Sequence, residues 1–260
     1  MDKKKKKIRP CYSYLRKKDP KFVATVIEQR FSDFIVKHGI FKGMQYIKTR
    51  ALWSQLFPKL LGSYERELYP LLKSLLDRDY SDIINIGCGE GYYTVGFALK
   101  FPKTKIYAFD INLQALSSCR KMCKANALEE SRFAFKRNCS PEILMNLPLG
   151  NRALIFMDCE GYEKELIEKY LPEKMKNHDF LIEVHDCMDI TISDYLKVAF
   201  DKTHNLKSVK SVDDVYKAKN YDYPELEGFN LMEKFYLLAE YRMRCMDWYY
   251  FSPRQTKNIS

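Results

Sequence analysis

The sequence predicts an α/β protein with a doubly wound, mostly parallel sheet and an N-terminal helical extension. After residue 80, short apolar runs alternate five times with amphipathic stretches, as in strands joined by helices that cover both faces of a sheet. Before that point, apolar residues recur at three- and four-residue steps, which is typical of helices. We therefore expect a basic, disordered tail at 1–20, a helical cap at 21–78 and a main domain at 79–260.

The helical cap begins with an apolar stripe that runs from Phe22 to Ile35. Gly39 and Gly43 interrupt this helix, and a leucine-rich pattern continues over 56–76. Such a segment either covers the core of the main domain or helps to close a substrate pocket.

The main domain is expected to hold five strands that are buried on both faces, because their runs are almost continuously apolar. These strands are predicted at 83–87, 105–110, 132–136, 153–158 and 180–185. The helices between and after them are predicted at 92–101, 113–126, 141–147, 162–171 and 190–200. The C-terminal part is expected to contain a strand at 206–212, a loop at 213–229, a helix at 231–245 and a strand at 248–252.

Positive charge is concentrated at the N-terminus. Residues 1–21 hold ten Lys or Arg side chains and two Asp, so this segment accounts for +8 of the net charge of +10. A lysine run is usually a solvated arm and less often contacts nucleic acid or an anionic surface. The rest of the chain, at about +2, gives no electrostatic argument for nucleic-acid binding.

No apolar run approaches the roughly 18 residues of a membrane span, and the basic start is not followed by the apolar segment of a secretory signal. The eight cysteines include no CxxC pair, which disfavours a structural zinc site. Cys88 and Cys159 adjoin apolar runs, where a free thiol packs as a small hydrophobe. A cytoplasmic protein with reduced cysteines is therefore expected.

The strongest motif is IINIGCGEGYY, an apolar strand that runs directly into Gly87, Gly89 and Gly91. Glycines here let the backbone turn tightly and approach a ligand, and ligands of such sheets bind outside the carboxyl ends of the strands. Residue 92 is Tyr, where a dinucleotide-binding turn has its third glycine. The turn therefore favours a ligand without a pyrophosphate.

Asp110 ends the second predicted strand, 23 residues after Gly87. A carboxylate at this place accepts hydrogen bonds from ribose hydroxyls; the alternative is a cap for the following helix. Asn138 follows the third strand, where its amide either meets an adenine edge or only forms a turn. The glycines and the acid together predict an adenosine-bearing ligand.

This constellation resembles the class I S-adenosylmethionine-dependent methyltransferases, which have a Rossmann-like fold, over about residues 80–200. Within that class, MDCEGYEKELI at 157–167 and LIEVHD at 181–186 resemble the FkbM-type O-methyltransferases, as does LGSYERELY at 61–69. The resemblance implies an enzyme that uses S-adenosylmethionine. It implies a cofactor site made of Gly87, Cys88, Gly89, Gly91, Asp110, Ile111, Asn138 and Asp158.

Methyl transfer from a sulfonium is an in-line displacement, so the enzyme must align the acceptor with the methyl carbon. A hydroxyl acceptor must also lose its proton to a nearby base. Asp158, Glu160 and His185 lie at the expected carboxyl edge, and His185 is the predicted general base because its reference pKa is about 6.5. A purely structural role is open for each, since acids such as Glu160 and Glu163 also suit a helix N-terminus.

A second mechanism uses a metal ion. Asp158 and Asp186 are expected to hold one Mg²⁺, because this ion takes one or two protein carboxylates together with waters and substrate oxygens. Such an ion would lower the pKa of the acceptor hydroxyl and orient it.

The expected function is O-methylation of a hydroxyl on a glycan or small metabolite. The alternative is an RNA methyltransferase that uses the basic tail as an electrostatic arm. Base-directed N-methyltransferases usually carry a Pro-Pro-aromatic turn after the fourth strand, whereas the segment 158–161 reads Asp-Cys-Glu-Gly, whose acids repel phosphate. A third reading is a non-catalytic cofactor-binding module or an NAD enzyme. The glycine spacing disfavours NAD, and the convergent carboxylates with a histidine disfavour a non-catalytic site.

Overall fold

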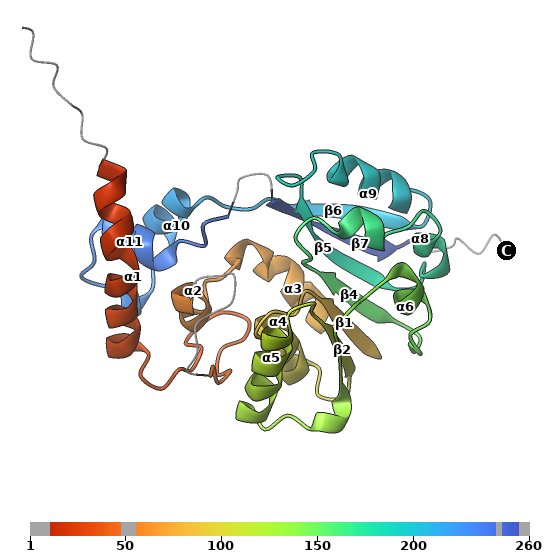
Figure 1. Cartoon of the computed structure of the whole chain (residues 1–260), viewed down its shortest axis with the longest axis horizontal. Coiled ribbons are helices and arrows are strands. Elements are labelled where there is room, and N and C mark those ends of the chain that lie inside the picture. The colour runs from red at the N-terminus through yellow and green to blue at the C-terminus, as the bar shows by residue number, and fades with distance from the viewer. Residues whose placement is uncertain (1–10, 48–55, 243–245, 255–260) are drawn as a thin grey trace, which may run out of the picture.

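The computed structural model describes residues 11–47, 56–242 and 246–254, and for 11–20 it describes the backbone only. At its centre lies a seven-stranded sheet of order β3-β2-β1-β4-β5-β7-β6 (Figure 1). The strands are β1 (Asp82–Ile86), β2 (Lys105–Phe109), β3 (Phe133–Lys136), β4 (Ala153–Met157), β5 (Asp179–His185), β6 (His204–Val209) and β7 (Met246–Pro253). The first five strands are mutually parallel, and β7 runs antiparallel to both β5 and β6.

The order of the strands reverses between β1 and β4. The chain moves outward from β1 through β2 to β3 and then returns to place β4 on the other side of β1. Loops that leave neighbouring strands on either side of such a switch point diverge, so a ligand can bind between them at the carboxyl edge. The mostly parallel, Rossmann-like fold expected from the sequence is thus confirmed.

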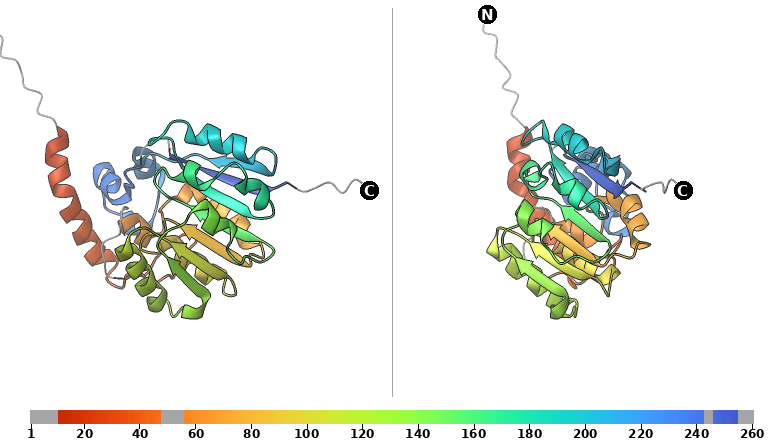
Figure 2. Two further views of the ribbon diagram at one scale, coloured as in Figure 1. Left: turned by 45° about the vertical axis from the view of Figure 1, so that its right-hand side comes forward. Right: turned by 90° about the vertical axis from the view of Figure 1, so that its right-hand side faces the viewer.

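Helices cover both faces of the sheet (Figure 2). They are α4 (Tyr92–Lys100), α5 (Leu113–Ala125), α6 (Pro141–Met145), α7 (Glu163–Leu166), α8 (Leu171–Lys174) and α9 (Ile192–Phe200). Alternate strand residues point to opposite faces: Ile83 packs in the core formed with α4 and α5, and Ile84 packs in the core formed with α6 to α9.

The single helix expected at 162–171 is wrong. The segment forms two short helices instead, because α7 ends at Leu166 and α8 begins at Leu171.

The N-terminal extension joins two C-terminal helices on one flank of the sheet domain (Figure 1). It consists of α1 (Cys11–Arg30), α2 (Leu56–Leu61), the 3₁₀ turn η1 (Arg66–Leu68) and α3 (Tyr69–Leu76), and the C-terminal partners are α10 (Asp214–Asn220) and α11 (Leu231–Leu238). The rings of Phe22 and Phe229 meet edge to face at 5.9 Å, which ties α1 to the segment before α11.

Four expectations for these outer segments need correction. The helix α1 already begins at Cys11, within the expected tail, because Lys, Arg and Leu favour helix even where charge accumulates; residues 1–10 lie outside the described part. That helix ends at Arg30, and the backbone then turns at Phe34, which has φ 53°. The expected loop at 213–229 contains α10, capped by the Asp213 side chain, and the helix expected at 231–245 ends at Leu238.

None of the helices in the described residues is both long and apolar enough to cross a membrane. Six cysteines fall within the described side chains, and all six are free thiols.

Candidate active site at the carboxyl edge of the sheet

The glycine turn after β1 lies directly against the loop after β4. Gly87 has φ +81°, and a Cβ placed on it would lie 1.6 Å from the carbonyl oxygen of Asp158. The N–H groups of Gly87 and Cys88 both donate to the carbonyl oxygen of Phe109 at 2.9 Å. A glycine is therefore required here for two reasons, the left-handed backbone and the close approach of a neighbouring chain segment.

Asp110 is bound to the glycine turn through its side chain. Its Oδ2 accepts a hydrogen bond from the Gly89 N–H at 2.8 Å, and its Oδ1 accepts one from the Asn112 N–H at 2.8 Å. The structure therefore brings the turn and the acid together, as the adenosine prediction requires. Each carboxylate oxygen has a second lone pair, so these backbone bonds leave acceptor capacity for ribose hydroxyls.

The other predicted cofactor residues differ in accessibility. Ile111 is 77% exposed and Asn138 is exposed beyond β3, so both side chains are accessible at the edge where the second and third strands end. The Cys88 side chain is buried, which leaves its backbone to face a ligand. At Gly91 a Cβ would lie 2.9 Å from the Cys119 sulfur, so this glycine lets α4 approach α5 closely.

Glu90, in the middle of the glycine turn, is held by the N-terminal extension. Its carboxylate is ion-paired with the buried Lys59 of α2 and accepts a hydrogen bond from the Tyr46 hydroxyl. Burial by itself raises the pKa of Glu90, but the Lys59 ammonium and the hydrogen bonds outweigh it and lower that pKa. The extension therefore does more than cover core, because it fixes one residue of the predicted cofactor turn.

His185 ends β5 and is fully buried. Its Nδ1 lies 2.6 Å from Oε1 of Glu163, which is also fully buried at the start of α7. Its Nε2 has no hydrogen-bond partner in the described part of the chain. Glu163 accordingly fixes the orientation of the ring and, as an acceptor, favours the tautomer with hydrogen on Nδ1.

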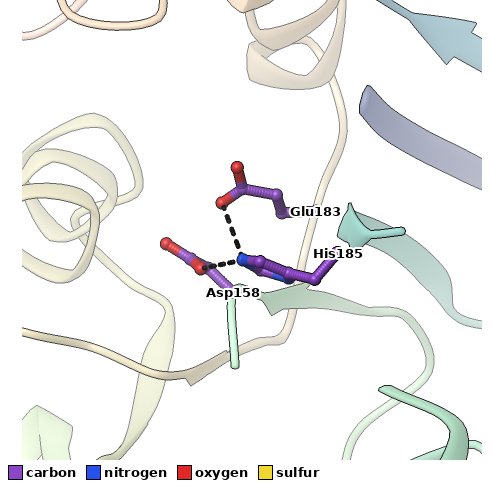
Figure 3. Close-up of side chains that lie close together, drawn as sticks. All are labelled: Asp158, Glu183 and His185. Atoms are coloured by element: carbon purple, nitrogen blue, oxygen red, sulfur yellow. Dashed lines mark ion pairs between the residues drawn. The ribbon is translucent and has the colours of Figure 1, made fainter. Parts of the chain in front are cut away.

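Three further carboxylates surround Nε2 of His185. Asp158 Oδ1 and Glu160 Oε2 each lie 3.6 Å away, and Glu183 Oε2 lies 3.9 Å away. Figure 3 shows Asp158 and Glu183 approaching the ring nitrogen from different strands. The structure therefore brings the predicted catalytic residues Asp158, Glu160 and His185 together.

The charges at this edge shift two protonation equilibria. Burial lowers the pKa of His185, but the hydrogen bond to Glu163 and the charges of Asp158 and Glu160 outweigh burial and raise it above its usual value. Burial raises the pKa of the Asp158 carboxyl, and the neighbouring His185 opposes that rise. The pKa of Asp158 is therefore raised to about 7, and that of His185 is raised as well, so both groups bind a proton more readily than they would in water.

The sequence prediction missed the buried ion pairs behind the site. Arg242, after α11, contacts the carboxylates of both Glu65 and Glu183. Glu65 adopts the left-handed conformation and also accepts a hydrogen bond from the Tyr93 hydroxyl. Glu183 lies inside a strongly apolar strand, and Glu65 lies in the predicted helical cap. A charged residue in such a segment is rarely buried without a partner, so the acid in the strand was the signal that could have predicted a buried ion pair.

The expected metal pair of Asp158 and Asp186 stays a prediction. Oδ1 of Asp186 accepts a hydrogen bond from the Ser193 N–H at 2.8 Å, which directs that carboxylate to the start of α9. The group whose ligand atoms lie within 4.8 Å of one another is Asp158, Glu183 and His185. This set fits Mg²⁺ poorly, because Mg²⁺ prefers oxygen ligands in a near-octahedral shell and Glu183 is already paired with Arg242.

Comparison with known proteins places the glycine turn in a methyltransferase family. The sequence profile of the Methyltransferase small domain matches residues 69–144, which include the turn and Asp110 and end before Asp158. This part of the chain is thus similar to a methyltransferase domain, in agreement with the resemblance seen in the sequence. The match does not extend to the residues around His185.

Among characterised proteins, the chain is 31% identical over 108 residues to the Ribosomal RNA large subunit methyltransferase G of Shewanella amazonensis. The alignment covers 41% of this chain and only 27% of that relative. Among solved structures, an rRNA methylase from Streptococcus thermophilus has a TM-score of 0.49 and 14% identity, covering 74% of this chain and 98% of the other. A precorrin-6y C5,15-methyltransferase from Geobacter metallireducens has a TM-score of 0.49 and 15% identity, with coverages of 82% and 94%.

Proposed function

We propose that the chain transfers a methyl group from S-adenosylmethionine to an acceptor bound at the carboxyl edge of β4 and β5. The observation that carries the proposal is the joining of Asp110 to Gly89 and of Gly87 to Asp158. These two contacts put a ribose-binding acid, a bare-backbone turn and the acceptor-side loop within one small region. An adenosine-bearing sulfonium ligand needs these three elements side by side.

In this proposal the cofactor lies over the glycine turn. Asp110 accepts hydrogen bonds from the ribose hydroxyls, and Ile111 and Asn138 lie beside the adenine because they are exposed where β2 and β3 end. The backbone of 87–91 faces the methionine portion, and the Asp158 loop lies next to the methyl group. S-adenosylmethionine supplies the electrophilic methyl carbon; the chain supplies binding and alignment.

His185 acts as the general base in this scheme. Its Nδ1–H donates to Glu163, so the lone pair of Nε2 faces the acceptor side and takes the proton as the acceptor oxygen or nitrogen attacks. Asp158 and Glu160, each 3.6 Å from Nε2, stabilise the imidazolium that forms. No step of this scheme requires a metal ion.

RNA is the acceptor that the comparisons favour, because the relative with 31% identity is named for ribosomal RNA. The lysine-rich N-terminus fits the same acceptor, since cationic side chains that neutralise phosphates raise affinity for any RNA sequence. The acids around His185 do not oppose this choice, since they face the reacting atom, and phosphates can bind elsewhere on the surface.

A hydroxyl on a glycan or small metabolite is the second candidate. It is favoured by the FkbM-like segment at 157–167, whose Glu163 is bound to His185 in the structure. A buried base held by a carboxylate suits a neutral hydroxyl, which is a poor nucleophile until it loses its proton.

Two measurements test the proposal in sequence. Isothermal titration calorimetry with S-adenosylhomocysteine and, separately, NAD first tests the cofactor; heat with NAD alone would overturn the assignment. Transfer of tritiated methyl from S-adenosylmethionine is then followed into total RNA and into a panel of hydroxylated sugars. Label that ribonuclease releases supports RNA, and label found in sugars alone supports the hydroxyl acceptor instead.

A further inference from the structure

An open groove of about 480 Å³ lies between α5 and the edge strand β3, on a surface that the proposed chemistry does not use. We call it the basic groove. Its lining holds four cationic side chains, one aromatic ring, two leucines and one serine: Arg120, Lys121, Lys124, Arg137, Phe135, Leu113, Leu116 and Ser117.

The basic groove has no acidic neighbour in the segments that form it. Residues 111–128, which include all of α5, contain no Asp or Glu, and neither do residues 131–141 around β3. The near-neutral charge of the chain outside its N-terminus therefore conceals a local concentration of positive charge. Potentials of this kind attract polyanions before any specific contact forms.

Two of the guanidinium groups are held in place by the fold. Arg120 lies over the Phe135 ring at 4.5 Å from its centroid, and Nε of Arg137 donates to the carbonyl oxygen of Ile111 at 3.4 Å. A guanidinium stacked on a ring keeps its N–H edges available for phosphate oxygens, which it binds in a bidentate manner. Because these side chains are already ordered, they lose less conformational entropy when a ligand binds.

The basic groove also adjoins the predicted cofactor edge. Leu113 begins α5 three residues after Asp110, and Arg137 directly precedes Asn138. Three strand spacings separate β3 from β4 in the sheet, which is about 14 Å. A strand of nucleic acid that lies in the groove therefore needs only a few nucleotides to reach the Asp158 and His185 edge.

We propose that the basic groove binds the sugar-phosphate backbone of a single-stranded segment of the RNA acceptor and directs a neighbouring nucleotide to His185. This inference rests on the proposed RNA acceptor. Single-stranded RNA fits because cationic grooves follow its backbone and tolerate any sequence, whereas the carboxylates at the reaction edge repel phosphate and keep the backbone on the groove side.

The test is the salt dependence of RNA binding by the full chain. Fluorescence anisotropy with a labelled single-stranded RNA is measured between 50 and 200 mM salt for the wild type, for R120Q/K124Q and for K202Q/K207Q. The control pair lies in exposed positions at and before β6, at the opposite edge of the sheet, and removes the same charge. Each phosphate contact adds about −0.7 to the slope of log K against log salt, so R120Q/K124Q should reduce the slope by about 1.4.

A reduction of that size in R120Q/K124Q, with an unchanged slope in K202Q/K207Q, supports the proposal. Equal slopes in wild type and R120Q/K124Q, equal losses in both variants, or no RNA binding would overturn it. The proposal would also be overturned if R120Q/K124Q lost binding to anionic phospholipid vesicles while its binding to RNA stayed unchanged. Calorimetry with S-adenosylhomocysteine on the same proteins distinguishes failure of the groove proposal from failure of the methyltransferase proposal. If cofactor binding is retained, the methyltransferase proposal stands even when the groove proposal fails.

Discussion

The hydrogen bond between Glu163 and His185 gives the most direct test of the proposed base. Nδ1 and Oε1 are 2.6 Å apart and both side chains are fully buried. A hydrogen bond to a charged group contributes about 1.5–3 kcal/mol, and about 1.4 kcal/mol corresponds to one pKa unit. Replacing Glu163 by Gln keeps an acceptor of similar shape but removes the charge, so the pKa of His185 should fall.

This shift is measurable without knowing the acceptor. The Cε1–H resonance of His185 is titrated by NMR in the presence of S-adenosylhomocysteine, and the wild type should titrate above the reference value of about 6.5. In Glu163→Gln the midpoint should move to lower pH. Glu160→Gln is the matched control. Glu160 is 69% exposed and solvent screens its charge, so this variant should lower the midpoint less than Glu163→Gln does.

The same variant also predicts a change in stability with pH. A histidine whose pKa is raised by folding stabilises the folded state below its unfolded pKa, and this contribution is lost as pH rises through the folded pKa. The wild type should therefore lose unfolding free energy above about pH 6.5, and Glu163→Gln should lose less. An unchanged or raised His185 midpoint in Glu163→Gln would refute the reasoning, since it would show that Glu163 does not stabilise the imidazolium.

Further outcomes follow from other contacts. Asp110→Ala should weaken S-adenosylhomocysteine binding about 10- to 100-fold in calorimetry, because charge-assisted hydrogen bonds to the ribose are lost; unchanged affinity would contradict its role. Gly87→Ala should abolish cofactor binding or folding, since its Cβ would lie 1.6 Å from a backbone carbonyl. Gly89→Ala meets no atom within 4 Å and adds only the backbone strain of its φ of +52°, so circular dichroism and calorimetry should show a smaller loss. Lys59→Met should lower the free energy of urea unfolding by about 3–5 kcal/mol because Glu90 loses its buried ion pair, and Glu90→Gln in addition should recover part of that loss. Treatment with EDTA should leave methyl transfer unchanged; loss restored by Mg²⁺ would replace the base mechanism with a metal mechanism.

The sheet could be predicted because its signal is local. Each of the first five strands reads as a short apolar run, and the predicted strand at 105–110 differs from β2 by a single residue. Burial on both faces imposes this composition on a parallel strand whatever its neighbours are. The glycine turn and Asp110 were found for a related reason, since bends and strand-end acids occur at fixed distances along the chain.

The outer segments were predicted less well because packing decides them. A helical stripe continues in the sequence beyond Arg30, yet the chain turns at Phe34 so that residues 35 and 45 form a bridge. The helix α10 lies in a Tyr- and acid-rich stretch without a clear periodicity. Such elements are stabilised by contacts with distant segments more than by their own composition.

By itself, then, the sequence determined the first five strands in chain order, the glycine turn, Asp110, and the positions of Asp158, Glu160 and His185 at one edge. Only the tertiary structure decided which of these side chains act together: Glu163 pairs with His185, Asp186 turns to Ser193, and Arg242 reaches two acids. The physical reason is that strand and turn preferences act between near neighbours, whereas a buried charge takes its partner from whatever segment the folded chain brings within a few ångströms.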